Sequence, residues 1–261
     1  MKPLRTLVQP AVRRPSRPAH LTAEQTAERA LLLRLLSLML QYPDAGLTAA
    51  RPSLTTAVRE LSPSPAAEQL AEFTAWFSDA DPEELERHYV EVFDLRRKSS
   101  LYLTYYLHGD TRRRGMALLT LAQSYRAAGW TVDGGELPDH LPVVLEFAAL
   151  AGPGAGEAPL RRHRRGLELI HHSLTDFHSP YVNLLGALLT LLPPPTAADL
   201  EAVARLAAEG PPTEDVGLDP YSGELFAPPQ TFVPPLPAPP SIVPPRPVTA
   251  PAATHDPEPA R

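Results

Sequence analysis

Proline is concentrated at one end of this 261-residue chain, which limits how much of it can fold into regular structure. Sixteen of the 33 prolines lie in residues 211–261, many of them as Pro-Pro pairs. Proline has no backbone N–H and cannot continue a helix, so this segment is typical of a disordered, polyproline-like tail. We therefore expect a folded domain at residues 21–210, between a basic flexible arm at 1–20 and the proline-rich tail at 211–261.

Helix-forming residues dominate the part of the chain between these tails. Isoleucine occurs only twice in the sequence while leucine and alanine are abundant, and this balance favours helices over strands. Side chains that cap helices stand at the start of several apolar runs, namely at Thr22, Ser64, Asp81 and Thr196. We predict an all-α fold, a single compact helical domain of about nine or ten helices with flexible N- and C-terminal tails. The expected helices cover residues 22–41, 47–61, 64–77, 81–93, 109–128, 137–150, 160–175, 179–192 and 196–210.

Net charge and cysteine content exclude several functional classes. The chain has 24 basic and 30 acidic residues and a formal net charge of −6, whereas nucleic-acid binding needs a dominant basic face. It has no cysteine, which excludes disulfide scaffolds, cysteine nucleophiles and thiolate-bound metals. Arg13-Arg14 precedes the apolar run at 30–40, but that run is short, contains Arg34 and lacks a cleavage site. Because no apolar stretch reaches about 20 residues, we expect a cytoplasmic protein without membrane insertion.

Known catalytic and metal-binding motifs are missing from the sequence. It contains no glycine-rich phosphate loop, no nucleophile elbow and no His-Glu-x-x-His pair. The adjacent residues His171 and His172 face different sides of a helix, so they cannot chelate one metal ion together. The basic run Arg161–Arg165 is typical of a solvated helix face, with nucleic-acid binding as the alternative. We therefore expect no catalytic residue, no metal and no cofactor.

An aromatic segment lies between two basic clusters, Arg96–Lys98 and Arg112–Arg114. Its three tyrosines, Tyr102, Tyr105 and Tyr106, form one stripe if the segment is helical. A tyrosine stripe offers apolar area with a polar rim, as protein-recognition surfaces do. The alternative is that the rings belong to the core, and the spacing alone does not decide between the two.

A second candidate is the acid–histidine pair of Asp139 and His140, which stands at the expected start of a helix. Such a pair can act as a general acid and base, or it can simply cap the helix. Because neither a nucleophile nor a metal-binding motif is near it in the sequence, the capping interpretation is favoured.

Taken together, these segments resemble a known family. The run LYLTYYLHGDTRRRGMALL, which starts at Leu101, and the run ELPDHL, which starts at Glu136, are similar to the nitrate reductase molybdenum cofactor assembly chaperones. This family, also called the delta subunit or NarJ family, is related to the TorD/DmsD-type reductase chaperones. The resemblance is dense over about 60 residues, is plausible over roughly 25–210, and does not cover the tails.

The resemblance implies a function that spacing alone does not. A chaperone of this kind binds the N-terminal segment of the nitrate reductase catalytic (alpha) subunit and permits molybdenum cofactor insertion before membrane docking. It is not itself an enzyme, and the proteins that deliver the molybdenum cofactor are further candidate partners. The residues expected to bind the partner peptide are Tyr102, Tyr105, Tyr106, His108, Asp110, Arg113, Arg114, Glu136, Asp139 and His140.

Three other functions stay open at this stage. The chain could serve another molybdoenzyme, one of the twin-arginine-exported reductases, because a shared fold does not fix the client. It could be a metal-dependent helical enzyme that uses Asp139 and His140. It could also be a nucleic-acid-binding regulator that uses Arg161–Arg165.

Overall fold

The structure is a computed structural model that describes residues 21–132 and 135–210. Over these residues the chain forms twelve α-helices and no strand, so the predicted all-α fold is confirmed. The predicted basic arm and proline-rich tail lie outside the described residues. The helices are α1 (Ala23–Met39), α2 (Ala45–Ala49), α3 (Arg51–Arg59), α4 (Pro65–Asp79), α5 (Pro82–Tyr89), α6 (Tyr105–His108), α7 (Arg112–Ala127), α8 (Leu141–Ala151), α9 (Ala158–Arg162), α10 (Arg164–Asp176), α11 (Val182–Leu191) and α12 (Ala197–Glu209).

The predicted capping side chains begin four of these helices. Thr22 and Gln25 form a reciprocal capping box at the start of α1. Thr196 and Asp199 do the same at α12. The side chains at the N-caps of α4 and α5, Ser64 and Asp81, each accept a hydrogen bond from a backbone N–H of the first turn. These bonds satisfy donors that a helix start otherwise leaves unpaired, which explains why the boundaries were readable from the sequence.

Several predicted helices are interrupted or shorter than expected. The helix expected at 47–61 is two helices, because Asp44 caps α2 separately and a proline lies in the first turn of α3. The helix expected at 160–175 is divided at His163 into α9 and α10. The helix expected to start at Leu137 starts only at Leu141. Before it the chain turns at Pro138 and Asp139, and His140 pairs with Tyr102, so a long-range contact overrides the local helix propensity.

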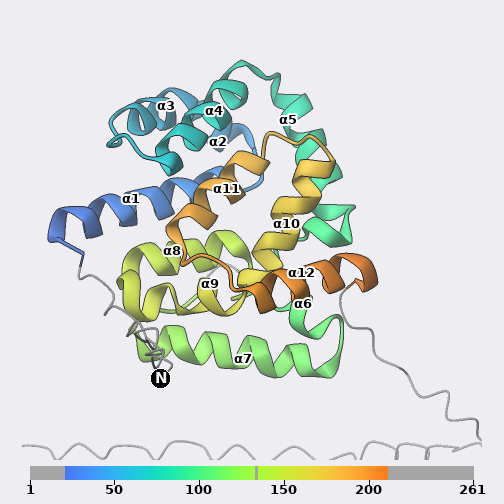
Figure 1. Ribbon diagram of the computed structural model, residues 1–261. Coiled ribbons are helices and arrows are strands. Elements are labelled where there is room, and N and C mark those ends of the chain that lie inside the picture. Colours follow the sequence, from blue (N-terminus) through green and yellow to red (C-terminus); the bar gives the residue numbers. More distant parts are fainter. Residues whose placement is uncertain (1–20, 133–134, 211–261) are drawn as a thin grey trace, which may run out of the picture. The chain divides into compact units, whose positions relative to one another are not determined.

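The helices pack around one apolar core. α1 lies against α8, α4 lies between α3 and α11, and α10 contacts both α11 and α12. Figure 1 shows α2–α5 on one side of α1 and α6–α9 on the other. Fully buried side chains such as Leu36, Phe73, Leu145 and Leu184 join these layers. Each such side chain contributes roughly 1.5–3 kcal/mol through burial, so the core accounts for most of the stability of the fold.

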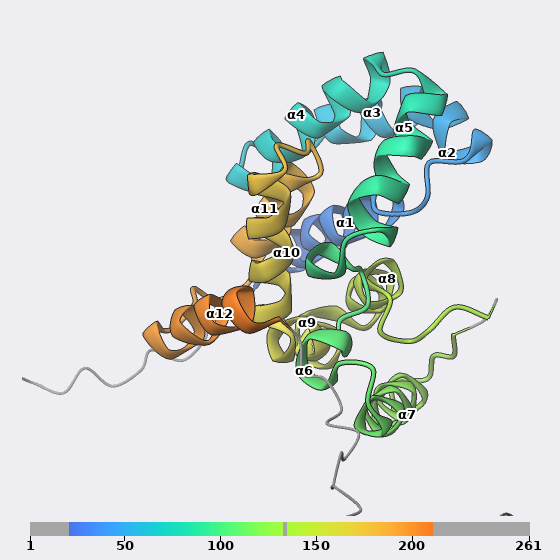
Figure 2. The same ribbon diagram turned by 90° about the vertical axis from the view of Figure 1, so that its right-hand side faces the viewer.

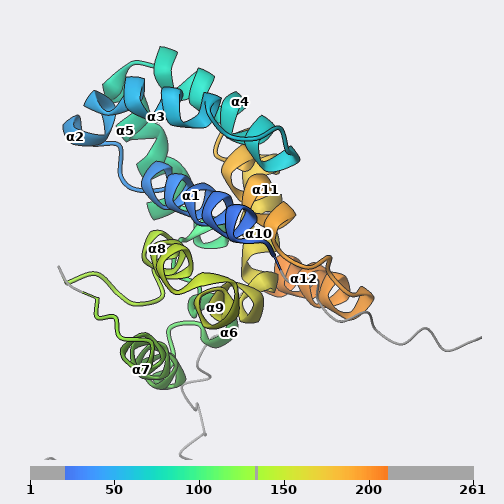
Figure 3. The ribbon, with the colours of Figure 1, turned by 90° about the vertical axis from the view of Figure 1, so that its left-hand side faces the viewer.

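α7 lies at the edge of the helical part, below α8 and α9 in all three ribbon views (Figures 1, 2 and 3). Only Leu121 and Tyr125 of this helix are buried. Met116 and Leu119 are 65% and 46% exposed, so one apolar row of α7 faces away from the core. None of the helices in the described ranges is long and apolar enough to cross a lipid bilayer.

Candidate functional site

The two segments that the sequence singled out are paired with each other. Tyr102 and His140 form an isolated antiparallel bridge. The N–H of Leu103 donates to the carbonyl of Asp139 (3.0 Å), and the N–H of Leu141 donates to that of Leu101 (2.8 Å). The predicted helical tyrosine stripe is therefore wrong, since Tyr102 lies in this bridge and α6 begins only at Tyr105.

Asp139 holds this junction together from inside the protein. Its side chain is fully buried. One carboxylate oxygen accepts hydrogen bonds from the backbone N–H of Thr104 (3.0 Å) and from its hydroxyl (2.5 Å). The same oxygen lies 3.8 Å from the guanidinium of Arg114. The capping interpretation is wrong, because no side chain caps α8 and the Asp139 carboxylate bonds to Thr104 instead.

Tyr102, Glu136 and His140 form a surface group beside the junction. The rings of Tyr102 and His140 stack with centroids 5.1 Å apart. Glu136 accepts a hydrogen bond from the Tyr102 hydroxyl (3.1 Å) and lies 3.5 Å from Nδ1 of His140. Burial, followed by the charge of Glu136, raises the pKa of Tyr102 to about 12. Burial lowers the pKa of His140 even though Glu136 opposes it, so the imidazole is neutral at pH 7.

These three side chains line a cavity of about 430 Å³, here called the acidic cavity. It lies between the end of α1, the turn after α5 and the start of α8. Asp94, Glu136 and Glu146 supply carboxylates, of which Glu146 is already ion-paired with Arg34 of α1, and none of the described lining residues is lysine or arginine. The full lining is Gln41, Tyr42, Tyr89, Phe93, Asp94, Leu101, Tyr102, Glu136, His140, Pro142, Val143 and Glu146. An aromatic wall with several carboxylates suits a ligand that carries both cationic and apolar groups.

A second cavity, of about 470 Å³, continues this surface along α8. Val143 and Glu146 line both cavities, so the two meet at these residues. The side chains that line the second cavity are mostly apolar, with Tyr125, Trp130, Val132, Phe147 and Leu150 among them, although Thr131 and Glu146 give it polar surface as well. Trp130 and Leu150 are 41% and 48% exposed. We call the two cavities together the α8 groove; one half is acidic and aromatic, and the other half is apolar.

The remaining predicted site residues do not lie in this groove. Tyr105 and Tyr106 are only 8% and 2% exposed and belong to the core. The Tyr106 hydroxyl donates to the carbonyl of Ser100 (2.7 Å). For these two rings the core interpretation is the correct one, and they add no surface to the groove. His108 and Arg113 line a different cavity.

Asp110 and Arg114 lie beside the junction and form an i, i+4 ion pair at the start of α7. Oδ1 of Asp110 is 3.2 Å from the Arg114 guanidinium, and Oδ2 is 3.4 Å from that of Arg97. The guanidinium of Arg114 also lies 5.7 Å from the centre of the Tyr102 ring. Arg114 therefore connects α7 to the back of the acidic cavity and does not face the open surface.

Sequence reasoning missed several residues of the groove. Tyr42, Asp94 and Trp130 were not singled out as site residues. They reach the groove through contacts between distant segments, which no local pattern encodes. A signal did exist for Glu146, which is one of the few polar residues in the otherwise apolar stretch 137–150.

The two alternative chemistries find little support in the geometry. Within residues 21–132 and 135–210, no three histidine, cysteine, aspartate or glutamate side chains converge as a metal ion would require. Much of the basic run at 161–165 is neutralised by ion pairs with carboxylates on the same or a neighbouring element. These pairs are Arg161 with Glu157, Arg164 with Glu168 and Arg165 with Asp199.

Comparison with known proteins identifies the relatives of the chain. The family model of the nitrate reductase delta subunit matches residues 59–186. A stretch of 154 residues is 39% identical to the nitrate reductase-like protein NarX of Mycobacterium tuberculosis; it covers 58% of this chain but only 23% of that protein. A stretch of 167 residues is 34% identical to the probable nitrate reductase molybdenum cofactor assembly chaperone NarJ of Bacillus subtilis, and covers 64% of this chain and 91% of that protein.

A third relative is the nitrate reductase molybdenum cofactor assembly chaperone NarJ of Escherichia coli. It is 32% identical over 179 residues, which cover 68% of this chain and 75% of that protein. The relatives named NarJ are assembly chaperones and not enzymes. Since two of these relatives are matched over most of their own length, and the family model covers most of the helices that build the groove, the chain belongs to the nitrate reductase delta subunit family.

Proposed function

We propose that this protein is an assembly chaperone for nitrate reductase that holds the N-terminal segment of the catalytic (alpha) subunit in the α8 groove. The observation that carries the proposal is the division of this groove into an acidic, aromatic half and an apolar half. A peptide with basic and apolar side chains would match both halves. The names of the NarJ relatives support the choice of nitrate reductase as the client.

The acidic half would recognise positive charge on the peptide. Asp94, Glu136 and Glu146 surround a partly enclosed volume with aromatic walls. In such a volume charges are screened less than on an open surface, so a lysine or arginine of the peptide gains more from each carboxylate. Because His140 is neutral at pH 7, it does not oppose that cation.

The apolar half would supply most of the remaining binding energy. Trp130 and Leu150 expose apolar area that a partner would remove from water. Aromatic anchors of this kind often carry a large share of the energy of a protein interface. While bound, the client segment would be kept from other contacts.

The chaperone would hold the catalytic subunit before assembly of the reductase is complete. We infer that the chaperone works in the cytoplasm and keeps the catalytic subunit open for molybdenum cofactor insertion until it docks at the membrane. The proteins that deliver the cofactor would then be transient partners of the same complex. On this proposal the chain itself holds no cofactor and performs no chemistry.

Isothermal titration calorimetry with an N-terminal peptide of the catalytic subunit tests the proposal. Glu136→Gln is expected to weaken binding severalfold by removing one charge, and Trp130→Ala about tenfold or more by removing an anchor. Glu201→Gln is the matched control, because Glu201 is exposed on α12 and, among the described residues, forms its ion pair with Arg205 alone. If both groove variants bind the peptide as tightly as the control does, the groove is not the binding site.

The identity of the client is tested in the same titration. A twin-arginine leader peptide from an exported reductase would also bring basic and apolar groups to the groove. Tighter binding of that leader than of the nitrate reductase peptide would assign the chain to the other client class. The expected result is the reverse order.

A further inference from the structure

A third cavity, of about 410 Å³, lies between α7 and the segment that contains α9, and it shares no lining residue with the α8 groove. We call it the α7–α9 cavity. Its lining is Leu107, His108, Arg113, Met116, Ala117, Thr120, Leu121, Ser124, Ala155, Ala158, Pro159, Arg162 and His163. Neither the proposed function nor the family comparison gives it a role.

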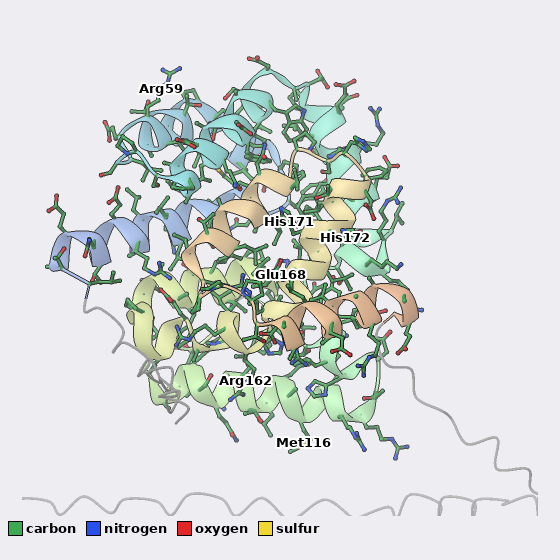
Figure 4. The ribbon with its side chains drawn as sticks, in the orientation of Figure 1. Arg59, Met116, Arg162, Glu168, His171 and His172 are labelled. Carbon is green, nitrogen blue, oxygen red and sulfur yellow. The ribbon has the colours of Figure 1, made fainter. Side chains whose placement is uncertain are left out.

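The charged groups of this cavity are all basic. Arg113 and Arg162 line it, and none of its described lining residues is aspartate or glutamate. The neighbouring arginines behave differently, since Arg114 pairs with Asp110 and Arg161 with Glu157. In Figure 4, Arg162 and Met116 lie at the α7 end of the helical part, and Arg59 lies at the opposite end.

An unused polar atom lies in the inner wall. His163 is only 6% exposed, and its Nδ1 is buried without a hydrogen-bond partner in the described part of the chain. Burial lowers the pKa of His163 to about 4, so the ring is neutral at pH 7 and adds no charge. A buried nitrogen without a partner is unfavourable, but this one has almost no accessible surface, so a ligand in the cavity could bond to it only if the ring moved.

The rest of the wall is apolar. Leu107, Met116, Leu121 and Pro159 supply most of this surface, and Met116 and Leu107 are 65% and 37% exposed. A volume of this size falls within the range of small-molecule pockets, which combine apolar walls with a few polar groups. Guanidinium groups bind phosphate and carboxylate through charge-assisted hydrogen bonds.

We propose that the α7–α9 cavity binds a small organic anion, a flat apolar body that carries a phosphate or a carboxylate. Arg113 and Arg162 hold the anionic group, and the apolar wall holds the body. The α8 groove, in contrast, attracts cations. The protein therefore has two sites of opposite preference, and a ligand of one does not compete with a ligand of the other.

Isothermal titration calorimetry on the full chain tests this site with four probes. 1-Naphthyl phosphate and 1-naphthoate share a flat body and differ in the anion, while 1-naphthol lacks the charge and inorganic phosphate lacks the body. We expect at least one of the two naphthyl anions to bind about tenfold or more tightly than 1-naphthol and inorganic phosphate. The order of the two anions decides between a phosphate and a carboxylate ligand. Equal affinity for 1-naphthol would overturn the proposal, because the arginines would then have no role.

Variants locate the binding to this cavity. Arg162→Ala and Arg113→Ala are each expected to lower the affinity for the more tightly bound naphthyl anion about tenfold. Both side chains are exposed, so the fold should survive, and an unchanged thermal midpoint verifies this. Arg59→Ala removes the same charge at the opposite end and should leave the affinity unchanged. Equal loss in all three variants would show that only net charge matters, and no loss in Arg162→Ala would place the ligand elsewhere.

Discussion

The α8 groove and the α7–α9 cavity are built from the same short segment but have opposite character. Tyr102 lines the groove, Leu107 and His108 line the other cavity, and Tyr106, which lies between them in the sequence, is buried in the core. Asp94 and Glu136 make the groove acidic, while Glu146 is already paired with Arg34, whereas Arg113 and Arg162 line the cavity and form no ion pair within the described residues. Local pairing thus decides what each surface attracts, and the net charge of the chain does not.

Removing the buried ring of Tyr106 should destabilise the fold that supports both sites. Tyr106→Ala deletes a buried ring and is expected to lower the free energy of unfolding by about 4 kcal/mol, measured by urea denaturation. Tyr106→Phe keeps the ring and loses only the bond to Ser100, so a loss of about 1 kcal/mol is expected. A small effect of Tyr106→Ala would mean that this ring is not part of the core that supports both sites.

Substituting Asp139 should weaken peptide binding in the α8 groove more than anion binding in the α7–α9 cavity. Asp139→Ala leaves the buried N–H and hydroxyl of Thr104 without an acceptor, so we expect a loss of about 3 kcal/mol in unfolding free energy. Asp139→Asn retains one acceptor oxygen and should lose less. Calorimetry on folded Asp139→Asn should show weaker peptide binding and unchanged binding of the naphthyl anion. Equal weakening of both ligands would contradict the assignment of Asp139 to the groove.

Lowering the pH should destabilise the fold through His163, the buried histidine of the α7–α9 cavity. The folded pKa of His163 is about 4, below the ordinary value near 6.5, so between these values the unfolded chain binds more protons than the folded one. Stability therefore falls as the pH falls from about 6.5 to 4, by roughly 3 kcal/mol for this residue. The charge of Asp139 opposes this lowering of the His163 pKa, whereas Arg162 and His108 add to it.

Urea denaturation of the wild type and of His163→Gln across this pH range measures the contribution. The slope of stability against pH should be smaller in the variant. A residual slope is expected, because burial also lowers the pKa values of His88, His140 and His171. An identical slope in both proteins would show that His163 is not protonated on unfolding in this range.

The sequence predicted the helices far better than it predicted the sites. Caps such as Thr22 and Asp81 act within one turn, so their effect on the fold is visible locally. Asp139 also looked like a cap, but its partner is Thr104, 35 residues away. The predicted stripe of Tyr102, Tyr105 and Tyr106 is wrong for the same reason. Tyr102 pairs with His140, so it is not part of the helix.

The α7–α9 cavity was hidden from the sequence for a related reason. Arg113 was part of one basic cluster and Arg162 of another, and each cluster is typical of a solvated surface. Only the fold shows that these two arginines line one cavity while their neighbours are paired with carboxylates. Pairing depends on which acidic side chain comes close, and this is a property of the tertiary structure.

Met116→Ala is expected to change stability least among these variants. It also distinguishes ligand binding at the two sites most clearly. The Met116 side chain is 65% exposed and lies on the outer row of α7, so Met116→Ala should change the free energy of unfolding by less than about 0.5 kcal/mol. It nevertheless supplies part of the apolar wall of the α7–α9 cavity. Calorimetry should show severalfold weaker binding of the naphthyl anion, because the flat body loses contact area, with unchanged binding of the client peptide. Leu200→Ala on α12 is a matched control, since Leu200 is 54% exposed and lines none of the three cavities. If Met116→Ala weakened the peptide instead of the anion, the cavity would belong to the client site and the two surfaces would have to be treated as one.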